Sequence, residues 1–294
     1  MIKKIAIIGA GGRMGGWFSK YFSRRKGITL LLYDINTSSL KDSDNTRICE
    51  DIVNCVGRAD LVMICVPISA IPHTIHACAT KMKSGAILVE ISSIKNRSYK
   101  ALKRIPKHVR PLSIHPMFGP SAPNLNLMNI ILIPIRNRNN ELRILKEVFE
   151  GSVVSIIPDP KLHDKFMSII LGLTYFTNLV FAIFVSKQDY RSLKQFSGTT
   201  FRIQSLLCTS ILLDEPDLIL ALLSENLLVR KQIRKYLVEA KKLESFISGN
   251  KLFKMKSNLE KLRSFYNEQQ SLELSYNQLY RIISYLNKSE NPLS

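Results

Sequence analysis

The sequence predicts an α/β protein in which an N-terminal, doubly wound and mostly parallel sheet is followed by an all-helical C-terminal domain. In the first half, short β-rich runs alternate with helical patterns, as in strand–helix–strand units. Several of these runs are apolar throughout, which is typical of parallel strands covered on both faces. From "DPKLHDKF" onward only helical patterns remain. The change near residue 158 predicts two domains, 1–158 and 159–294.

Seven segments are expected to form the strands of the sheet. Each is rich in Val, Ile or Leu, and most end at a residue that favours turns. In chain order they read "KKIAIIG", "ITLLLYD", "ADLVMICVP", "GAILVEIS", "RPLSIHP", "NIILIPI" and "SVVSIIP". In the helical half, Pro216 in "LLDEPDLIL" marks a junction between two helices.

One segment of the helical half raises the question of a membrane. Residues 166–186, "FMSIILGLTYFTNLVFAIFVS", carry no charge and are long enough to span a bilayer. However, Ser, Gly, Thr and Asn residues dilute the segment, and the chain has no second candidate. A helix that is apolar all round also fits the centre of a helical domain or a dimer interface. We therefore expect a buried helix and no membrane.

Composition narrows the class of protein further. The chain has 294 residues with 46% hydrophobic content, which is enough for substantial cores. Its five cysteines include no CxxC pair, and the N-terminal apolar run is too short for a signal peptide, so we expect reduced thiols in a cytoplasmic protein. The net charge of +19 permits anionic partners, but much of it lies at helical spacing among Glu and Leu in the last third. This pattern favours solvated helix faces, and nucleic acid is not the expected partner.

A glycine cluster, "IAIIGAGGRMGGWF", follows the first predicted strand and opens a helix. In a dinucleotide-binding turn, the first glycine makes the bend, the second lets the backbone approach the pyrophosphate, and the third lets the helix pack on the strand. No register of the cluster is a complete GxGxxG. The register Ala10, Gly12, Gly15 departs least, because alanine replaces only the first glycine.

Asp34 supports this register, because a Rossmann-type site places an acidic residue about 20 residues on, at the end of the next strand, where it accepts the ribose hydroxyls. No Arg or Lys directly follows Asp34, so NAD is preferred over NADP. The strand "ADLVMICVP" ends beside the same site. The expected cofactor-binding residues are Gly9, Ala10, Gly12, Arg13, Met14, Gly15, Asp34, Val66 and Pro67.

Two further polar stretches follow predicted strands, at the edge where open parallel sheets bind their ligands. The first, "VEISSIKN", contains Ser92, Ser93 and Lys95; the second, "SIHPMFGPSAP", contains His115. Imidazole is well suited to accept a hydroxyl proton near neutral pH. From position alone, His115 is as consistent with a structural role as with a catalytic one.

The motifs "GAGGRMGGWF", "ISSIKN", "HPMFGPS" and "HDKFM", in this order over residues 3–185, resemble the prephenate dehydrogenase (TyrA) family in an archaeal-like form. The resemblance implies a Rossmann domain, a dimerising helical domain and NAD-dependent oxidative decarboxylation of prephenate to 4-hydroxyphenylpyruvate. It assigns His115 as the acceptor of a hydrogen bond from the ring hydroxyl. It also assigns Ser93 to orienting that hydroxyl and the nicotinamide, and Lys95 to the substrate side.

The chain departs from the family pattern on the substrate side. Leu171 and Tyr175 stand where family members commonly have glutamine and histidine, and Ser210 falls where an arginine clamps a substrate carboxylate. A guanidinium is the natural bidentate partner of a carboxylate, so Arg202, about two helical turns earlier, is the expected replacement. We expect Tyr175 to contact the substrate as well.

Three other histidines and one aspartate are not assigned to the site. His163 and Asp164 open the helical domain, where helix capping, a domain contact and catalysis are equally consistent with the sequence. His73 and His76 form an HxxH pair without a nearby carboxylate or thiol set, so they are expected on a helix surface. No metal site is predicted.

Other functions stay open at this stage. The same reaction on arogenate is one, since the pocket that separates the two substrates cannot be placed. A β-hydroxyacid or imine-reductase type of dehydrogenase shares the two-domain plan, but the lysine those β-hydroxyacid enzymes need is absent from residues 166–186. The net charge and the substituted positions also allow a non-catalytic NAD-binding or nucleic-acid-binding protein. Salt-dependent retention on DNA together with no turnover of prephenate would favour this alternative.

Overall fold

The computed structural model describes residues 2–290, and their contacts form two compact units. The sheet unit comprises the chain up to Ser168 together with Leu220–Asn226. The helical unit comprises Ile169–Ile219 and the chain from Leu227 onward. The division lies one helix later than the boundary predicted near residue 158, because Pro160–Met167 (α6) packs with the sheet unit.

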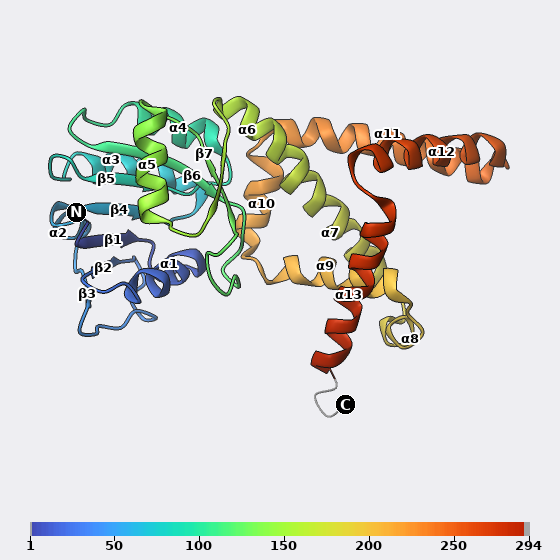
Figure 1. The fold of residues 1–294 in the computed structure, drawn as a ribbon, viewed down its shortest axis with the longest axis horizontal. Coiled ribbons are helices and arrows are strands. Elements are labelled where there is room, and N and C mark those ends of the chain that lie inside the picture. Colours follow the sequence, from blue (N-terminus) through green and yellow to red (C-terminus); the bar gives the residue numbers. More distant parts are fainter. Residues whose placement is uncertain (1, 291–294) are drawn as a thin grey trace. The chain divides into compact units, whose positions relative to one another are not determined.

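The sheet unit is built on eight strands in the order β3-β2-β1-β4-β5-β6-β7-β8 (Figure 1). All neighbouring strands pair in parallel except β6 and β7, which are antiparallel. The chain reverses its direction of winding between β1 and β4, which is where doubly wound sheets bind ligands. The strands are β1 Lys4–Ile8, β2 Thr29–Tyr33, β3 Thr46–Ile48, β4 Leu61–Ile64, β5 Ile87–Glu90, β6 Arg110–Pro116, β7 Asn129–Leu132 and β8 Val153–Ile156.

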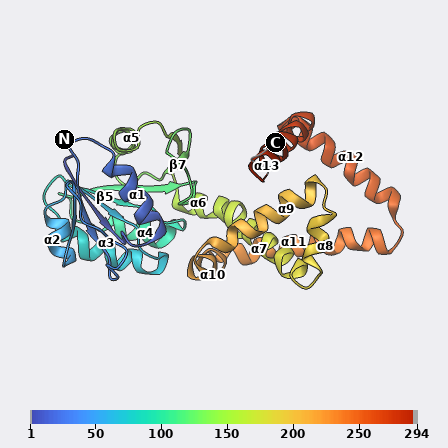
Figure 2. The ribbon, with the colours of Figure 1, turned by 90° about the horizontal axis from the view of Figure 1, so that it is seen from below.

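Helices cover both faces of this sheet, and each face has its own apolar core. One core joins the strands to α1 (Arg13–Ser23) and α5 (Arg138–Val148). The other joins them to α2 (Ile52–Gly57), α3 (Ile71–Ala79) and α4 (Lys95–Lys103). Figure 2 shows α5 and α2–α4 on opposite sides of the sheet. Burial on both faces explains why the strands are apolar throughout.

The predicted fold class is confirmed, and all seven expected strands form. An eighth strand, β3, was not predicted; it is three residues long and lies at the edge of the sheet. Its sequence, Thr-Arg-Ile, has one exposed charged residue and no apolar run, so hydrophobic pattern alone does not reveal it.

The helical unit contains the remaining helices, apart from the second half of α10, which belongs to the sheet unit. It has only a few buried apolar side chains, among them Val185, Cys208 and Val229. A π-helical turn, Ser168–Leu173, connects α6 to α7. The basic residues of α11 lie on the surface, as the charge pattern predicted. The helices are α7 Thr174–Val185, α8 Tyr190–Gln195, α9 Thr199–Ser210, α10 Pro216–Ser224, α11 Leu227–Ser248, α12 Leu252–Gln269 and α13 Leu272–Glu290, with short 3₁₀ turns at Ile68–Ala70 and Ile211–Leu213.

The apolar segment from α6 to α7 is not buried within a single chain, contrary to the expectation of a central helix. Among residues 2–290, Pro160–Val185 alone is long and apolar enough to cross a membrane, and only 22% of its most apolar window is buried. Ile183 and Phe184 are 57% and 65% exposed. The segment therefore presents an apolar surface in the single chain.

Candidate active site

The glycine turn joins the carboxyl end of β1 to the first turn of α1. Gly9 has a φ of +86°, and a Cβ there would lie 2.6 Å from the carbonyl oxygen of Cys65. Its backbone N–H donates to the Tyr33 carbonyl at 2.9 Å, which ties the turn to the end of β2. The bend therefore requires glycine at position 9. This corrects the predicted register at its first position, because the bend falls on Gly9 and Ala10 is merely buried after it.

The packing at Gly15 fits the third glycine role, and the second role, at Gly12, stays a prediction. A Cβ on Gly15 would come within 2.0 Å of the Gly9 carbonyl oxygen, so only glycine lets α1 approach the turn this closely. Gly12 is exposed and caps α1, and its nearest neighbour to a built Cβ is 3.4 Å away. No acidic residue lies in the first turn of α1. Such an open helix N-terminus fits the pyrophosphate of a dinucleotide.

Asp34 lies against this turn, directly after β2. Its Oδ2 accepts the backbone N–H of Gly11 at 2.9 Å, and its Oδ1 accepts that of Asn36 at 3.0 Å. The carboxylate is half-buried and keeps lone pairs for a ribose hydroxyl. Val66 and Pro67 follow β4, next to the Cys65 carbonyl that faces Gly9. The structure thus brings the two ends of the predicted cofactor site together.

The remaining predicted cofactor residues, Arg13 and Met14, are the first two residues of α1. Both are half-buried, and Met14 packs against the core beneath the sheet face. Their contacts with the cofactor remain predictions.

The two serines after β5 have different surroundings. Ser92 is buried, and its hydroxyl donates to the Ile94 carbonyl at 2.8 Å while accepting the Ile94 N–H at 3.2 Å. These bonds form the local turn before α4. Ser93 is half-buried, and its hydroxyl has no hydrogen-bond partner within residues 2–290. Of the two, Ser93 is the serine whose hydroxyl is available to a ligand.

A buried ion pair lies beneath this turn. Lys95 and Glu90 are both fully buried, and Lys95 Nζ lies 2.7 Å from Glu90 Oε1. The ammonium also donates to the Ile114 carbonyl at 2.6 Å, Ser113 donates its hydroxyl to Glu90 Oε1, and Glu90 Oε2 accepts the Ser92 N–H at 2.9 Å. This placement does not support the predicted substrate contact of Lys95. Instead, Lys95 fixes the end of β6 one residue before His115.

His115 is near the carboxyl end of β6, at the sheet edge that carries the glycine turn, and it is 4% exposed. Its Nδ1 lies 3.0 Å from Nε2 of His163, a fully buried residue of α6. The Nδ1 of His163 lies 2.9 Å from Asp164 Oδ1. The Nε2 of His115 has no hydrogen-bond partner in the described part of the chain. The structure thus presents one unpaired nitrogen at the end of a three-residue chain.

Burial sets the protonation of both rings. It lowers the pKa of His115 well below its usual 6.5, and the neighbouring His163 and Lys95 lower it further. Burial also lowers the pKa of His163, against the opposing effect of the hydrogen bond with Asp164. Both imidazoles are therefore neutral at neutral pH, and a neutral imidazole has one donor and one acceptor nitrogen.

The predicted substrate residues of the later chain belong to the helical unit. Tyr175 is half-buried on α7, where its hydroxyl donates to Asp214 Oδ2 at 2.7 Å. Arg202 is half-buried on α9 and donates to Asn287 Oδ1 at 2.7 Å. Leu171 lies within the π-helical turn, and Ser210, at the end of α9, bonds its own helix. Their substrate contacts remain predictions.

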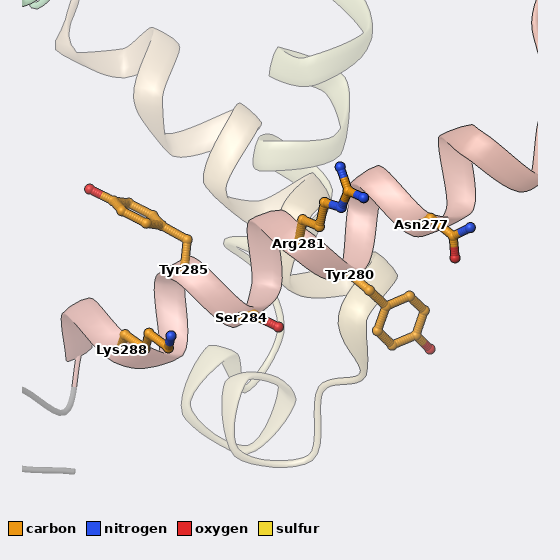
Figure 3. A pocket seen from close by; sticks show the side chains of 6 residues that line it. All are labelled: Asn277, Tyr280, Arg281, Ser284, Tyr285 and Lys288. Carbon is orange, nitrogen blue, oxygen red and sulfur yellow. The ribbon is translucent and has the colours of Figure 1, made fainter.

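The other candidate histidines do not belong to a metal-binding cluster in the described residues. His73 and His76 are exposed on α3, and no cluster of three or more metal-ligating side chains occurs in the described residues. A hollow on α13 is lined by Tyr280, Arg281 and Tyr285, whose side chains point in different directions around the helix (Figure 3). The cluster around His115 instead brings histidines, a lysine and carboxylates into mutual contact away from solvent.

Three members of this cluster were not predicted to meet there: Glu90, His163 and Asp164. Asp164 accepts the backbone N–H groups of Lys95 and Asn96 at 2.8 and 3.0 Å, across a large separation in the chain. The adjacent "HD" in "HDKFM" was a visible signal. Its partners were not visible, because they come from β6 and from the start of α4.

The fold and the site together define a two-domain dinucleotide-binding protein, with a doubly wound sheet unit and a helical unit. Residues 20–157 match the family described as prephenate dehydrogenase, nucleotide-binding domain, and residues 159–263 match prephenate dehydrogenase, dimerization domain. The two matches span most of the chain, so it belongs to the prephenate dehydrogenase family. The predicted family and its nucleotide-binding domain are confirmed. The glycine turn precedes the matched residues and rests on its own geometry.

Curated relatives support the same family. The chain is 31% identical over 182 residues to a probable arogenate/prephenate dehydrogenase of Methanocaldococcus jannaschii, covering 58% of this chain and 40% of that protein. It is 23% identical to the T-protein of Haemophilus influenzae, covering 81% of this chain and 61% of that protein. The matches thus span only about two fifths to three fifths of the lengths of these relatives.

Solved structures share the fold over nearly the whole chain. A prephenate dehydrogenase from Aquifex aeolicus, in complex with hydroxyphenyl propionate and NAD+, has a TM-score of 0.73 at 20% identity and covers 92% of this chain and 99% of that one. An arogenate dehydrogenase from Synechocystis has a TM-score of 0.65 at 18% identity and covers 91% of this chain and 100% of that one. At these identities the likeness supports the architecture alone.

Proposed function

We propose that this protein is a NAD-dependent prephenate dehydrogenase that converts prephenate to 4-hydroxyphenylpyruvate and CO2. The observation that carries the proposal is His115, a buried, neutral histidine with a free Nε2 at the sheet edge of the glycine turn. A base in this position can accept a hydrogen bond from the hydroxyl of the carbon that is oxidised. Family membership supports the substrate class.

The cofactor is proposed to be NAD. The bend at Gly9, the close approach at Gly15 and the open N-terminus of α1 fit a pyrophosphate, and Asp34 fits an unphosphorylated ribose. Ile35, directly after Asp34, is 96% exposed and offers no cation to a 2′-phosphate. The solved relative from Aquifex aeolicus is a complex with NAD+. When bound, the nicotinamide supplies the hydride acceptor.

The reaction then asks little acid–base chemistry of the protein's own residues. Hydride leaves the ring carbon that carries the hydroxyl, and the ring carboxylate departs as CO2, leaving its electron pair to complete the aromatic ring. His115 Nε2 accepts the hydrogen bond of the hydroxyl and stabilises its oxygen as the C–O bond gains double-bond character. Ser93 is proposed to orient the same hydroxyl. Such catalysis depends mainly on alignment of the reacting groups.

Arg202 and Tyr175 are proposed to bind the substrate side chain. Arg202 offers a bidentate donor for a carboxylate, and Tyr175 offers a hydroxyl whose position is fixed by Asp214. In an Arg202→Ala variant, KM for the substrate rises while the affinity for NAD is retained. An unchanged KM would remove Arg202 from the site.

The helical unit is proposed to form a homodimer in the cytoplasm. Its matched family is described as a dimerization domain, and its apolar side chains, such as Ile183 and Phe184, are exposed in a single chain. A second copy is a better match for this surface than lipid, because α7 carries the buried amide of Asn178, which is bonded to Gln204 and Cys208 of the same unit. The same segment begins with the buried polar residues of the His115 cluster.

The decisive experiment follows NADH formation with prephenate and with arogenate in parallel. The proposal expects turnover of prephenate with NAD and little with NADP. Preferred turnover of arogenate would assign the second substrate of the family, a possibility that the name of the Methanocaldococcus jannaschii relative also supports. Absence of turnover with both substrates would refute the proposed activity.

A further inference from the structure

The chain Asp164–His163–His115 is more than a set of buried contacts, because its direction of hydrogen bonding can be worked out. It contains two links, His163 Nδ1 to Asp164 Oδ1 at 2.9 Å and His115 Nδ1 to His163 Nε2 at 3.0 Å. Both rings are buried, so water does not compete for these nitrogens.

Asp164 is fixed as an acceptor at one end of the chain. Its Oδ1 receives the N–H of Lys95 as well as His163, and its Oδ2 receives the N–H of Asn96. Backbone N–H groups can only donate, so both carboxylate oxygens of Asp164 act as acceptors at the start of α4. Asn226 also donates to the Asp164 carbonyl at 2.7 Å and holds its backbone.

The proton on each ring then follows in sequence. A carboxylate acceptor requires a proton on Nδ1 of His163, and a neutral ring leaves its Nε2 as an acceptor. That acceptor requires a proton on Nδ1 of His115, which leaves Nε2 of His115 without one. We propose that His163 and Asp164 are positioning residues that hold His115 in the tautomer whose Nε2 accepts the substrate hydroxyl.

This inference deepens the proposed function and rests on the role given there to His115. The lowered pKa values of both histidines support it. A doubly protonated ring has no acceptor nitrogen, so it could not accept a hydrogen bond at Nε2. Residues that hydrogen-bond the far nitrogen of a catalytic histidine act through the orientation and tautomer of its ring, and they need not touch the substrate.

The direct test is the tautomer of His115 in the full-length protein, labelled with 15N-histidine and measured by long-range 1H–15N NMR without substrate or cofactor. We expect a protonated Nδ1 and an unprotonated Nε2, assigned by loss of the signals in His115→Asn. A proton on Nε2 of His115 would overturn the inference. Because this measurement requires no turnover, it is independent of whether prephenate is the substrate.

Variants at His163 supply the second arm. His163→Leu removes the acceptor, so the Nδ1 proton of His115 loses its partner, the tautomer shifts, and kcat falls about 100-fold with little change in KM. His163→Gln keeps an acceptor oxygen, so it should retain the tautomer and most of kcat. An unchanged His115 tautomer in His163→Leu, or equal losses in both variants, would refute the positioning role. His73→Gln on exposed α3 is the matched control for both readouts.

Discussion

The sheet unit and the helical unit differ in how completely each satisfies its own side chains. In the sheet unit, strands and helices enclose two apolar cores, and a buried network pairs Glu90, Lys95 and Asp164. In the helical unit few side chains are buried, and large apolar ones such as Phe184 and Phe196 lie exposed. The sheet unit therefore buries its apolar side chains within a single chain, whereas the helical unit leaves many of its apolar side chains exposed. Under the proposed function, this difference corresponds to the catalytic His115 lying in the sheet unit and the surface for self-association lying in the helical unit.

The largest effect is expected at the free nitrogen of the sheet unit. Replacing His115 with alanine removes the hydrogen-bond acceptor for the substrate hydroxyl, and NADH formation should fall by about 10²- to 10⁴-fold. Binding of NAD, measured by calorimetry, should be retained, because the glycine turn and Asp34 are untouched. An active alanine variant would end the role proposed for His115.

The next largest effect is expected on the stability of the sheet unit, when its buried ion pair is broken. Lys95→Met leaves the Glu90 carboxylate buried without its partner, and the free energy of unfolding should fall by about 3–5 kcal/mol. Denaturant unfolding followed by circular dichroism measures this change. Lys100→Met, at an exposed position of the same helix, is the matched control and should stay within about 0.5 kcal/mol of the parent. Equal effects would mean that the network contributes no more than surface charge.

A smaller effect is expected where the helical unit is proposed to meet its copy. Phe184→Asp places a charge on the exposed apolar face of α7 and should weaken the dimer by about 1.5–3 kcal/mol per subunit. Light scattering across a dilution series follows the shift toward monomer. Val53→Asp, at a 47% exposed apolar position of the sheet unit, should leave the mass unchanged. A parent protein that is monomeric at all concentrations would contradict the proposed homodimer.

The smallest effect is a pH dependence of stability. His115 and His163 have lowered pKa values in the folded state, so below about pH 6.5 the unfolded chain binds protons that the folded chain does not. Stability should therefore fall as the pH decreases from 6.5, by up to about 1.4 kcal/mol per pH unit for each histidine, until the folded pKa is reached. His115→Asn should reduce this slope, while His73→Gln on the surface should not. A slope unaffected by His115→Asn would show that His115 is not buried neutral.

The acid limb of kcat/KM reports the same group. Because the ring must be neutral to accept a hydrogen bond, activity should persist below pH 6.5 and decline only as His115 becomes protonated. Lys95 and His163 face this ring and hold its pKa down, while Glu90 and Asp164 oppose the effect at His163.

Local pattern was enough to predict the sheet, the position of Asp34 and the candidacy of His115. Apolar runs, turn residues and strand ends are properties of neighbouring residues, and they determine which segments pair and where their polar ends meet. The close approach at Gly15 fits the predicted register for the same reason, and the role of Gly12 stays a prediction. The sequence by itself therefore determined the fold class and the edge of the sheet at which ligands bind.

Only the tertiary structure decided which polar groups meet inside that edge. The bend fell on Gly9 because the carbonyl of Cys65, the residue directly after β4, leaves no room for a side chain. Lys95 turned inward to Glu90, and Asp164 reached the start of α4 while presenting His163 to His115. The exposed α7 likewise became visible only when its neighbours were placed. Such contacts join residues that are distant in the chain. Hydropathy and spacing describe neighbouring residues only, so they do not predict which distant acceptor pairs with a buried donor.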